Sequence, residues 1–460
     1  MLAPGPARAA TLLLDALCER EDAPPPADGV APEVLRERLR EGDGAARDEA
    51  LAFAHGRSLR PRVAALLAME HARVTLPDGG ELSVDEAERL LANKEDRRTF
   101  APLRKALDAV ARGPLEAGEE AGEDFEDALE EAGLSTTSEL VDVEGARASL
   151  DAFLGETRAL GETCLEVLES EGGAPARDPA ALSRALDLPD EAGGFSSQAA
   201  LAFGRALSAA AERRRARGLV RLVVPRALAG LVVTAAPGPV RVGSCAALRA
   251  WRFASLVDGA ASGVAAALFS EQQLSAPGED AARTFGRALG LSSLSPTVRM
   301  AILDEGARAA EKKSRVGRAT WLLHARLRAA VARALLVEGD DPEQRFELAH
   351  DAVVEALGAS PEAALVRSLL LPPWPGLVRL RGRVASLGGF AVGTALAVDL
   401  HLRLRERFDE AFALVPAPYD LVADAAQPLA DGAVALAQLV DGGAPSTRAG
   451  PLVSWASELL

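Results

Sequence analysis

Cysteine is scarce in this sequence of 460 residues. The three cysteines, Cys18, Cys164 and Cys245, are far apart and form no CxxC pair, so neither a disulfide framework nor a thiolate zinc site is supported. A short apolar run from Thr11 to Leu17 lacks the positively charged start of a secretory signal. No apolar run reaches the ~18 residues that a membrane span needs. We therefore expect a cytoplasmic protein that does not enter the membrane.

Positive charge is also in deficit. The chain has 51 Lys and Arg against 67 Asp and Glu, which gives a formal net charge of −16. Nucleic-acid binding depends on Lys and Arg that neutralise phosphates, so an extended nucleic-acid surface is not expected. We interpret the local basic run ERRRARG, residues 212–218, as a solvated helix face.

Aromatic residues make up only 4% of the chain, against 48% for hydrophobic residues as a whole. A composition rich in Ala and Leu favours helices that pack through small side chains, so we expect a mainly α fold. A short hairpin is expected near residues 73–83, because RVTLPDGGELS alternates around an Asp-Gly turn. Ser83 and Glu86 then form a capping box at the start of a helix. A small β-sheet segment is expected near residues 218–243, where prolines interrupt a run of Val and Leu.

Composition divides the chain into three parts. Residues 1–114 are predicted to form an N-terminal helical subdomain that includes the hairpin, and residues 140–460 a larger helical domain. Between them, residues 115–139 are rich in acid and glycine and lack Lys and Arg. Such a segment repels itself and has little to bury, so it is predicted to be an acidic linker or a loosely held acidic helix. Helical spacing of apolar residues resumes over residues 143–172.

The motifs of common catalytic sites are missing as well. The sequence has no HExxH, GxSxG, GxxxxGK[ST] or GxGxxG, so a zinc-peptidase helix, a nucleophile elbow, a P-loop and a dinucleotide fingerprint are all unsupported. No two histidines lie three to five residues apart. The histidines are His55, His71, His324, His350 and His401.

One region nevertheless has a familiar order of elements. The segments RLVVP and LVV, followed by GSCAALRAWRFASLVDGAASGVAAALFSE, resemble the catalytic region of the oligoendopeptidase- and thimet-type (gluzincin) zinc metallopeptidases. In that family a short β segment leads into the HExxH helix, and a second helix supplies a glutamate ligand. Residues 335–358 and 389–420 look like the family's C-terminal helices. The resemblance covers residues 205–440 and implies a helical metallopeptidase-like fold for the domain of residues 140–460.

The resemblance also implies a degenerate active site. It puts Cys245 at the first histidine, Ala246 at the general-base glutamate and Arg249 at the second histidine, and Gly263 falls near the third ligand. Alanine cannot take a proton from water and glycine offers no ligand. The guanidinium of Arg249 would repel a divalent cation, and a single thiolate is not a zinc site. We therefore expect a degenerate member of the family with no catalytic residues, no metal and no cofactor.

Two further candidate sites are weaker. Glu347 and His350 form an ExxH pair of the kind found in di-iron bundles, but no second copy exists. His350 borders the predicted buried stripe of Phe346, Val353 and Leu357, so a structural histidine is favoured. The family's C-terminal tyrosines or histidines stabilise an oxyanion, whereas the one tyrosine of this chain, Tyr419, is expected in a loop.

The leading hypothesis is a pseudoenzyme, a catalytically inactive metallopeptidase-like protein. It would act as a peptide- or protein-binding or regulatory module, with an active sibling peptidase as one candidate partner. The first alternative is a helical scaffold or assembly protein without peptidase ancestry, whose acidic segment of residues 115–139 contacts a basic partner. The second is a hydrolase with a non-standard site, in which Cys245 is the nucleophile and His324 or His401 the base.

Overall fold

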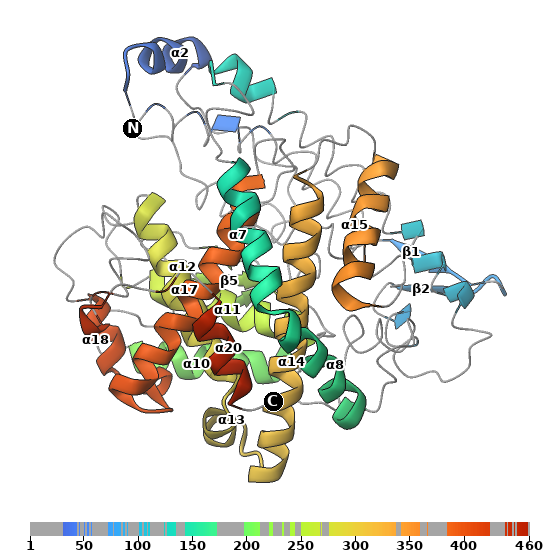
Figure 1. Ribbon diagram of the computed structural model, residues 1–460, viewed down its shortest axis with the longest axis vertical. Helices are drawn as coiled ribbons and strands as arrows, with labels where there is room; N and C mark the ends of the chain where they lie inside the picture. The colour runs from blue at the N-terminus through green and yellow to red at the C-terminus, as the bar shows by residue number, and fades with distance from the viewer. Residues whose placement is uncertain are drawn as a thin grey trace.

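The computed structural model describes most of the second half of the chain and parts of the first (Figure 1). The longest described segments are residues 31–43, 143–172, 197–211, 250–266, 276–336, 342–358, 384–423 and 449–458, with shorter stretches between them. Within these segments no helix is both long and apolar enough to cross a lipid bilayer.

Helices dominate the described residues, and the prediction of a mainly α fold is confirmed. The helices are α2 (Pro32–Arg40), α7 (Val143–Glu156), α8 (Arg158–Gly172), α10 (Ser197–Ala211), α11 (Ala250–Ala266), α12 (Ala276–Leu291), α13 (Pro296–Leu303), α14 (Ala307–Ala334), α15 (Pro342–Leu357), α17 (Val384–Phe408), α18 (Ala417–Ala423) and α20 (Gly450–Ser457). Two short 3₁₀ turns, η2 (Ser292–Leu294) and η4 (Phe412–Leu414), precede α13 and α18.

The expected hairpin is present. Strands β1 (Arg73–Thr75) and β2 (Glu81–Ser83) pair antiparallel, with Val74 opposite Leu82. Asp78 accepts a hydrogen bond from the amide of Gly80 at 3.0 Å, which closes the turn as the sequence predicts. The capping box is confirmed too: the Ser83 amide donates to Glu86 at 2.8 Å, and the Glu86 amide donates to the Ser83 hydroxyl at 3.2 Å.

The second small sheet is also confirmed. Strands β3 (Val220–Val223), β4 (Val232–Val233) and β5 (Val240–Gly243) form a sheet in the order β3-β5-β4. The pair β3 and β5 is parallel, and the pair β4 and β5 is antiparallel. Helix α11 begins a few residues after β5 and packs against this sheet, and α12 packs against α11.

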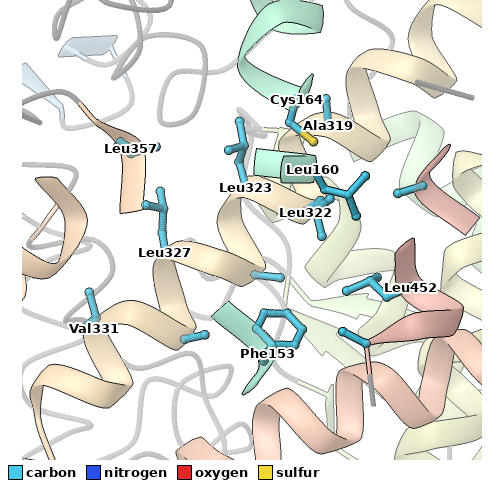
Figure 2. Close-up of a cluster of buried hydrophobic side chains, with 14 of the residues drawn as sticks. Phe153, Leu160, Cys164, Ala319, Leu322, Leu323, Leu327, Val331, Leu357 and Leu452 are labelled. Atoms are coloured by element: carbon cyan, nitrogen blue, oxygen red, sulfur yellow. The ribbon is translucent and has the colours of Figure 1, made fainter. Parts of the chain in front are cut away.

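Two large clusters of buried side chains lie on either side of α17. One joins α10, α11 and α12 with the C-terminal half of α17 and the turn η4. The other joins α7, α8, α14, α15 and α20, and Figure 2 shows Phe153, Leu323 and Leu452 within it. The long helix α14 runs through the middle of the molecule (Figure 1) and supplies much of the second cluster. The apolar stripe of α14 therefore organises this part of the fold.

The helical stretch of residues 143–172 is broken at Thr157, which the sequence pattern does not show. The guanidinium of Arg326, on α14, donates to the Leu154 carbonyl at 2.9 Å and to the Thr157 hydroxyl at 2.5 Å. Gly161 leaves the space for this arginine, because an added Cβ would lie 2.7 Å from Arg326 Nε. Arg326 thus satisfies the Leu154 carbonyl near the end of α7, a contact that only the tertiary structure creates.

The acidic segment of residues 115–139 is only partly described, and that part is not linker-like. Ala128, Leu129 and Ala132 are fully buried in a cluster with Leu35 of α2. The charged residues point outward, and Glu131 pairs with Arg57 at 2.5 Å. The prediction of a loosely held acidic helix did not take account of the apolar residues that recur every third or fourth position in this part of the segment and pack on α2. The domain boundary itself stays a prediction.

Candidate functional site

Three of the four degenerate positions, Cys245, Ala246 and Arg249, lie outside the described residues. The fourth, Gly263, is buried in the C-terminal half of α11. The sequence interpretation placed Gly263 on a second helix, and this is wrong. Residues Ala250–Ala266 form one continuous helix, because the stretch contains no proline and Ala sustains a helix through its two interior glycines.

The next described helix, α12, crosses α11 and approaches it closely at two glycines. A Cβ added at Gly286 would overlap the backbone of Ser262, and one added at Gly290 would overlap the carboxylate of Asp258. Gly286 and Gly290 are one turn apart on α12, as are Asp258 and Ser262 on α11, so each pair shares one helix face. The two helices are therefore in direct contact along this face.

Charged side chains gather beside the same crossing. The carboxyl group of Asp258 is desolvated, which raises its pKa to about 7, while the nearby guanidinium of Arg287 acts in the opposite direction. Burial also lowers the pKa of Arg328, on α14, to about 9, and the positive charge of Arg287 adds to this shift. Arg287 Nη1 lies 3.5 Å from the hydroxyl of Thr394 on α17. Residues from four helices thus form one polar cluster.

The two histidines that the sequence offered as bases are buried and neutral. His324 lies one turn before Arg328 on α14, and burial together with the charge of Arg328 holds its pKa well below the usual range. Burial lowers the pKa of His401 to about 3, against a hydrogen bond of its Nδ1 to the Ala288 carbonyl at 2.9 Å. The His401 ring also packs edge-on against Phe412, with centroids 5.2 Å apart. Cys245, the nucleophile of that alternative, lies outside the described residues.

This polar cluster does not fit a zinc ion. Zinc takes three or four ligands from Cys, His, Asp and Glu, whereas the cluster combines one carboxylate with two permanent cations, Arg287 and Arg328. Across the described residues no group of three or more His, Cys, Asp or Glu side chains is arranged to hold a metal ion. The chemistry open to the cluster is charge compensation between its own side chains.

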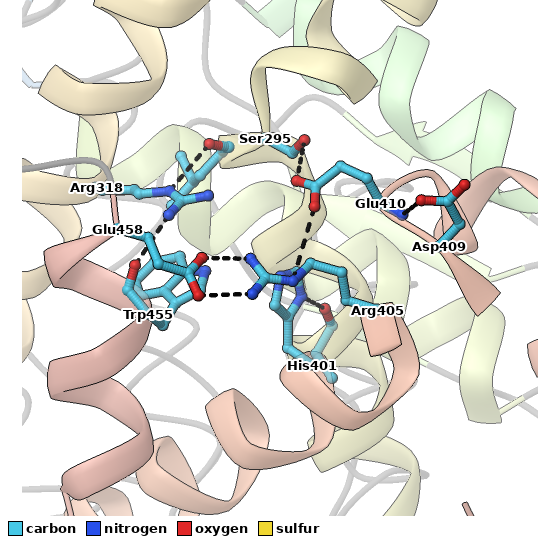
Figure 3. Close-up of polar contacts among 10 residues, drawn as sticks. Ser295, Arg318, His401, Arg405, Asp409, Glu410, Trp455 and Glu458 are labelled. Atoms are coloured by element: carbon cyan, nitrogen blue, oxygen red, sulfur yellow. Dashed lines mark hydrogen bonds and ion pairs between the residues drawn. The ribbon is translucent and has the colours of Figure 1, made fainter. Parts of the chain in front are cut away.

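A second polar cluster, which sequence analysis missed, surrounds the last described helix (Figure 3). Arg405, on α17, binds both carboxylate oxygens of Glu458 at 2.6 and 2.7 Å and lies 3.7 Å from Glu410. Glu410 in turn accepts a hydrogen bond from the Ser295 hydroxyl at 2.7 Å. These residues come from three separate parts of the chain, so no local sequence motif predicts the cluster.

The position of Tyr419 differs from the expected loop. It lies in α18 and not in a loop, and it is almost fully buried. Its hydroxyl donates to the Ala413 carbonyl at 2.7 Å, and its ring meets Phe285 edge-on with centroids 6.0 Å apart. Burial raises the pKa of this phenol. The proline-rich surroundings suggested a loop, but Pro418 sits in the first turn of the helix, where proline is tolerated.

The ExxH pair on α15 has no partner that would make it a metal site within the described residues. Val353 and Leu357 are buried, and Phe346 packs against the same cluster, as the stripe predicts. His350 is half-buried beside Phe346 and lies 3.6 Å from Asp351.

Comparison with known proteins gives no match by sequence: no family model and no curated protein matches the chain. Some solved structures are similar to the chain over most of its length. A Pyrococcus furiosus carboxypeptidase in a form described as Apo-Mg is 13% identical, with a TM-score of 0.49, over 99% of this chain and 97% of that one. A structure described as BsuCP is 13% identical, with a TM-score of 0.46, over 93% and 87%. An M32 carboxypeptidase from Deinococcus radiodurans R1 is 14% identical, with a TM-score of 0.43, over 99% and 89%.

No oligoendopeptidase or thimet-type peptidase is among these three structures. Similarity at this level assigns neither a family nor an activity to the chain.

Proposed function

We propose that the protein is a catalytically inactive, metallopeptidase-like helical protein that acts by binding a peptide or another protein. The observation that carries the proposal is the crossing of α11 and α12. The short sheet is followed by α11, and α12 packs directly on α11. This is the order of elements that the resemblance implies, but a cluster of one carboxylate and two guanidiniums lies beside the crossing.

The chemistry of this cluster supports inactivity. Asp258 has a pKa near 7, as general acids and bases often do. However, its carboxylate lies against the Gly290 backbone and near the charge of Arg287. A zinc-activated water would need at least two further ligands in place of these neighbours. The full sequence supports the same conclusion, since it contains no HExxH.

The charge of the chain and the absence of HExxH from its sequence support a binding role. A net charge of −16 favours basic partners and disfavours nucleic acid. A cytoplasmic active sibling peptidase with a basic surface would be one such partner, and regulation of that enzyme would be the consequence.

The experiment measures bound metal and hydrolysis in the same purified full-length sample. Metal content is determined by mass spectrometry before and after dialysis against zinc, and hydrolysis is followed on a mixed peptide library. We expect less than stoichiometric zinc and no turnover. Stoichiometric zinc together with turnover would overturn the proposal. Turnover without metal that disappears in Cys245→Ala would instead establish the thiol hydrolase.

A further inference from the structure

Helix α20 is held in the protein by one large anchor, Trp455, which is fully buried. The indole ring meets Trp321 edge-on with centroids 5.6 Å apart, and His401 at 6.2 Å. The guanidinium of Arg318 lies over the same ring, 4.5 Å from its centroid. Leu452, one turn earlier on the same face, is buried as well. The rings of α14 and α17 therefore form a socket for a single aromatic side chain.

Polar contacts hold the end of the helix (Figure 3). Arg318 donates to the Trp455 carbonyl at 3.0 Å, which is one of the carbonyls left without a partner where a helix ends. Arg405 binds the carboxylate of Glu458 through two hydrogen bonds. An arginine fork on a carboxylate and an aromatic anchor in a pocket are the contacts that proteins use to recognise a peptide.

The fit of the helix in this socket is incomplete. The Trp455 indole nitrogen is buried and has no hydrogen-bond acceptor within the described residues. A buried donor without an acceptor weakens docking. The helix itself has only eight residues and has little stability apart from its contacts. Both features make α20 easier to displace than a longer core helix.

We propose that residues 450–458 occupy, in cis, a helix-binding socket formed by Arg318, Trp321, His401 and Arg405. A partner would enter the socket with a short amphipathic helix that carries an aromatic residue three positions before an acidic one, as in Trp455 and Glu458. The proposal rests on the binding role proposed above and names both its surface and the chemistry of its partner. The chain's own helix then acts as an internal competitor that keeps the socket closed.

The test uses a fluorescein-labelled peptide with the sequence of residues 447–460 and measures its binding by fluorescence anisotropy. The docked helix competes at a high effective concentration, so the full-length wild-type protein should bind the peptide weakly. The full-length variant Glu458→Arg places two arginines together and weakens the internal helix. It should bind the unchanged peptide about five-fold more tightly than the wild type.

Two matched controls isolate the arginine fork. Ser454→Arg introduces the same side chain on the exposed face of α20 and should leave the affinity within about two-fold of wild type. A labelled peptide with arginine in place of its glutamate cannot pair with Arg405 and should bind Glu458→Arg about five-fold more weakly than the unchanged peptide does. Equal binding of both peptides would overturn the proposal.

Hydrogen exchange supplies an independent measurement on the wild-type protein. The amides of residues 452–458 should exchange faster than those of residues 322–331 in α14, because the helix opens without global unfolding. Equal exchange in the two segments would show a fixed core element and overturn the proposal. Failure of the socket would leave the metal and hydrolysis results unchanged, and peptide turnover would overturn the proposed function without altering the anisotropy result.

Discussion

Two arginine and carboxylate pairs in this protein behave in opposite ways. Beside the crossing of α11 and α12, desolvation of Asp258 outweighs the charge of Arg287, and the pKa of the carboxyl is raised to about 7. Beside α20, the hydrogen bonds from Arg405 outweigh burial, and the pKa of Glu458 is lowered. The Glu458 side chain is 43% exposed, so water still solvates its charge. Desolvation decides the direction at Asp258, and direct hydrogen bonds from the guanidinium decide it at Glu458, although each carboxyl has an arginine nearby.

The two directions have opposite consequences for stability. A carboxyl whose pKa is raised by folding stabilises the folded state least at high pH, since folding then requires a desolvated charge. A carboxyl whose pKa is lowered by folding contributes stability above its ordinary pKa and loses it in acid. The crossing and the α20 socket can therefore be told apart by the pH dependence of two single variants.

The largest effect is expected from Gly286→Ala, which removes the close approach that desolvates Asp258. The added Cβ would overlap the Ser262 backbone, and backbone cannot rotate away, so α11 and α12 must separate. We expect the free energy of unfolding to fall by about 3 kcal/mol, measured by urea denaturation. Because the helices separate, the pKa of Asp258 should also move back toward its ordinary value.

The matched control is Gly155→Ala. Gly155 lies on the exposed side of α7, and an added Cβ there meets no atom within 4 Å. Alanine is the better helix former, so this variant should gain about 0.5–1 kcal/mol. Equal losses in both variants would show that glycine flexibility, and not the helix crossing, is what the substitution at position 286 disturbs.

A smaller effect is expected from Asp258→Asn, which keeps the shape of the side chain and removes its charge. Folding raises the pKa of Asp258, so at pH values well below its ordinary pKa of 3.8 the wild-type group is protonated in both states and the two proteins should have similar stability. As pH rises toward 7, the wild type should lose about 2 kcal/mol relative to the variant. Urea denaturation from pH 4 to pH 8 measures this difference. A constant difference over that range would contradict the raised pKa.

Sequence patterns predicted those features that neighbouring residues determine. The hairpin, the Ser83 capping box and the short sheet each depend on a few consecutive residues, and all three are present. The same patterns missed contacts between distant parts of the chain. Asp258 and Arg287 are carried by separate helices, and Arg405 and Glu458 are 53 positions apart. Tyr419 was misplaced because a proline near a helix start resembles a loop until the packing around it is known.

The smallest effect is expected from Glu458→Gln, and its sign should be opposite to that of Asp258→Asn. Arg405 would keep one hydrogen bond but lose the opposite charge of a pair whose side chains are 23% and 43% exposed. For such exposed pairs the loss is about 0.2–1 kcal/mol at neutral pH. It should vanish as pH falls through the lowered pKa of Glu458, because the wild-type carboxylate is then protonated as well.

At about 1 M salt the loss of stability in Glu458→Gln at neutral pH should shrink, since the Debye length falls to about 3 Å. The pH-dependent difference for Asp258→Asn should persist, because that carboxyl is desolvated and salt screens it less. Urea denaturation of both variants at two salt concentrations measures this contrast, and equal salt sensitivity would mean that water reaches both pairs to the same extent.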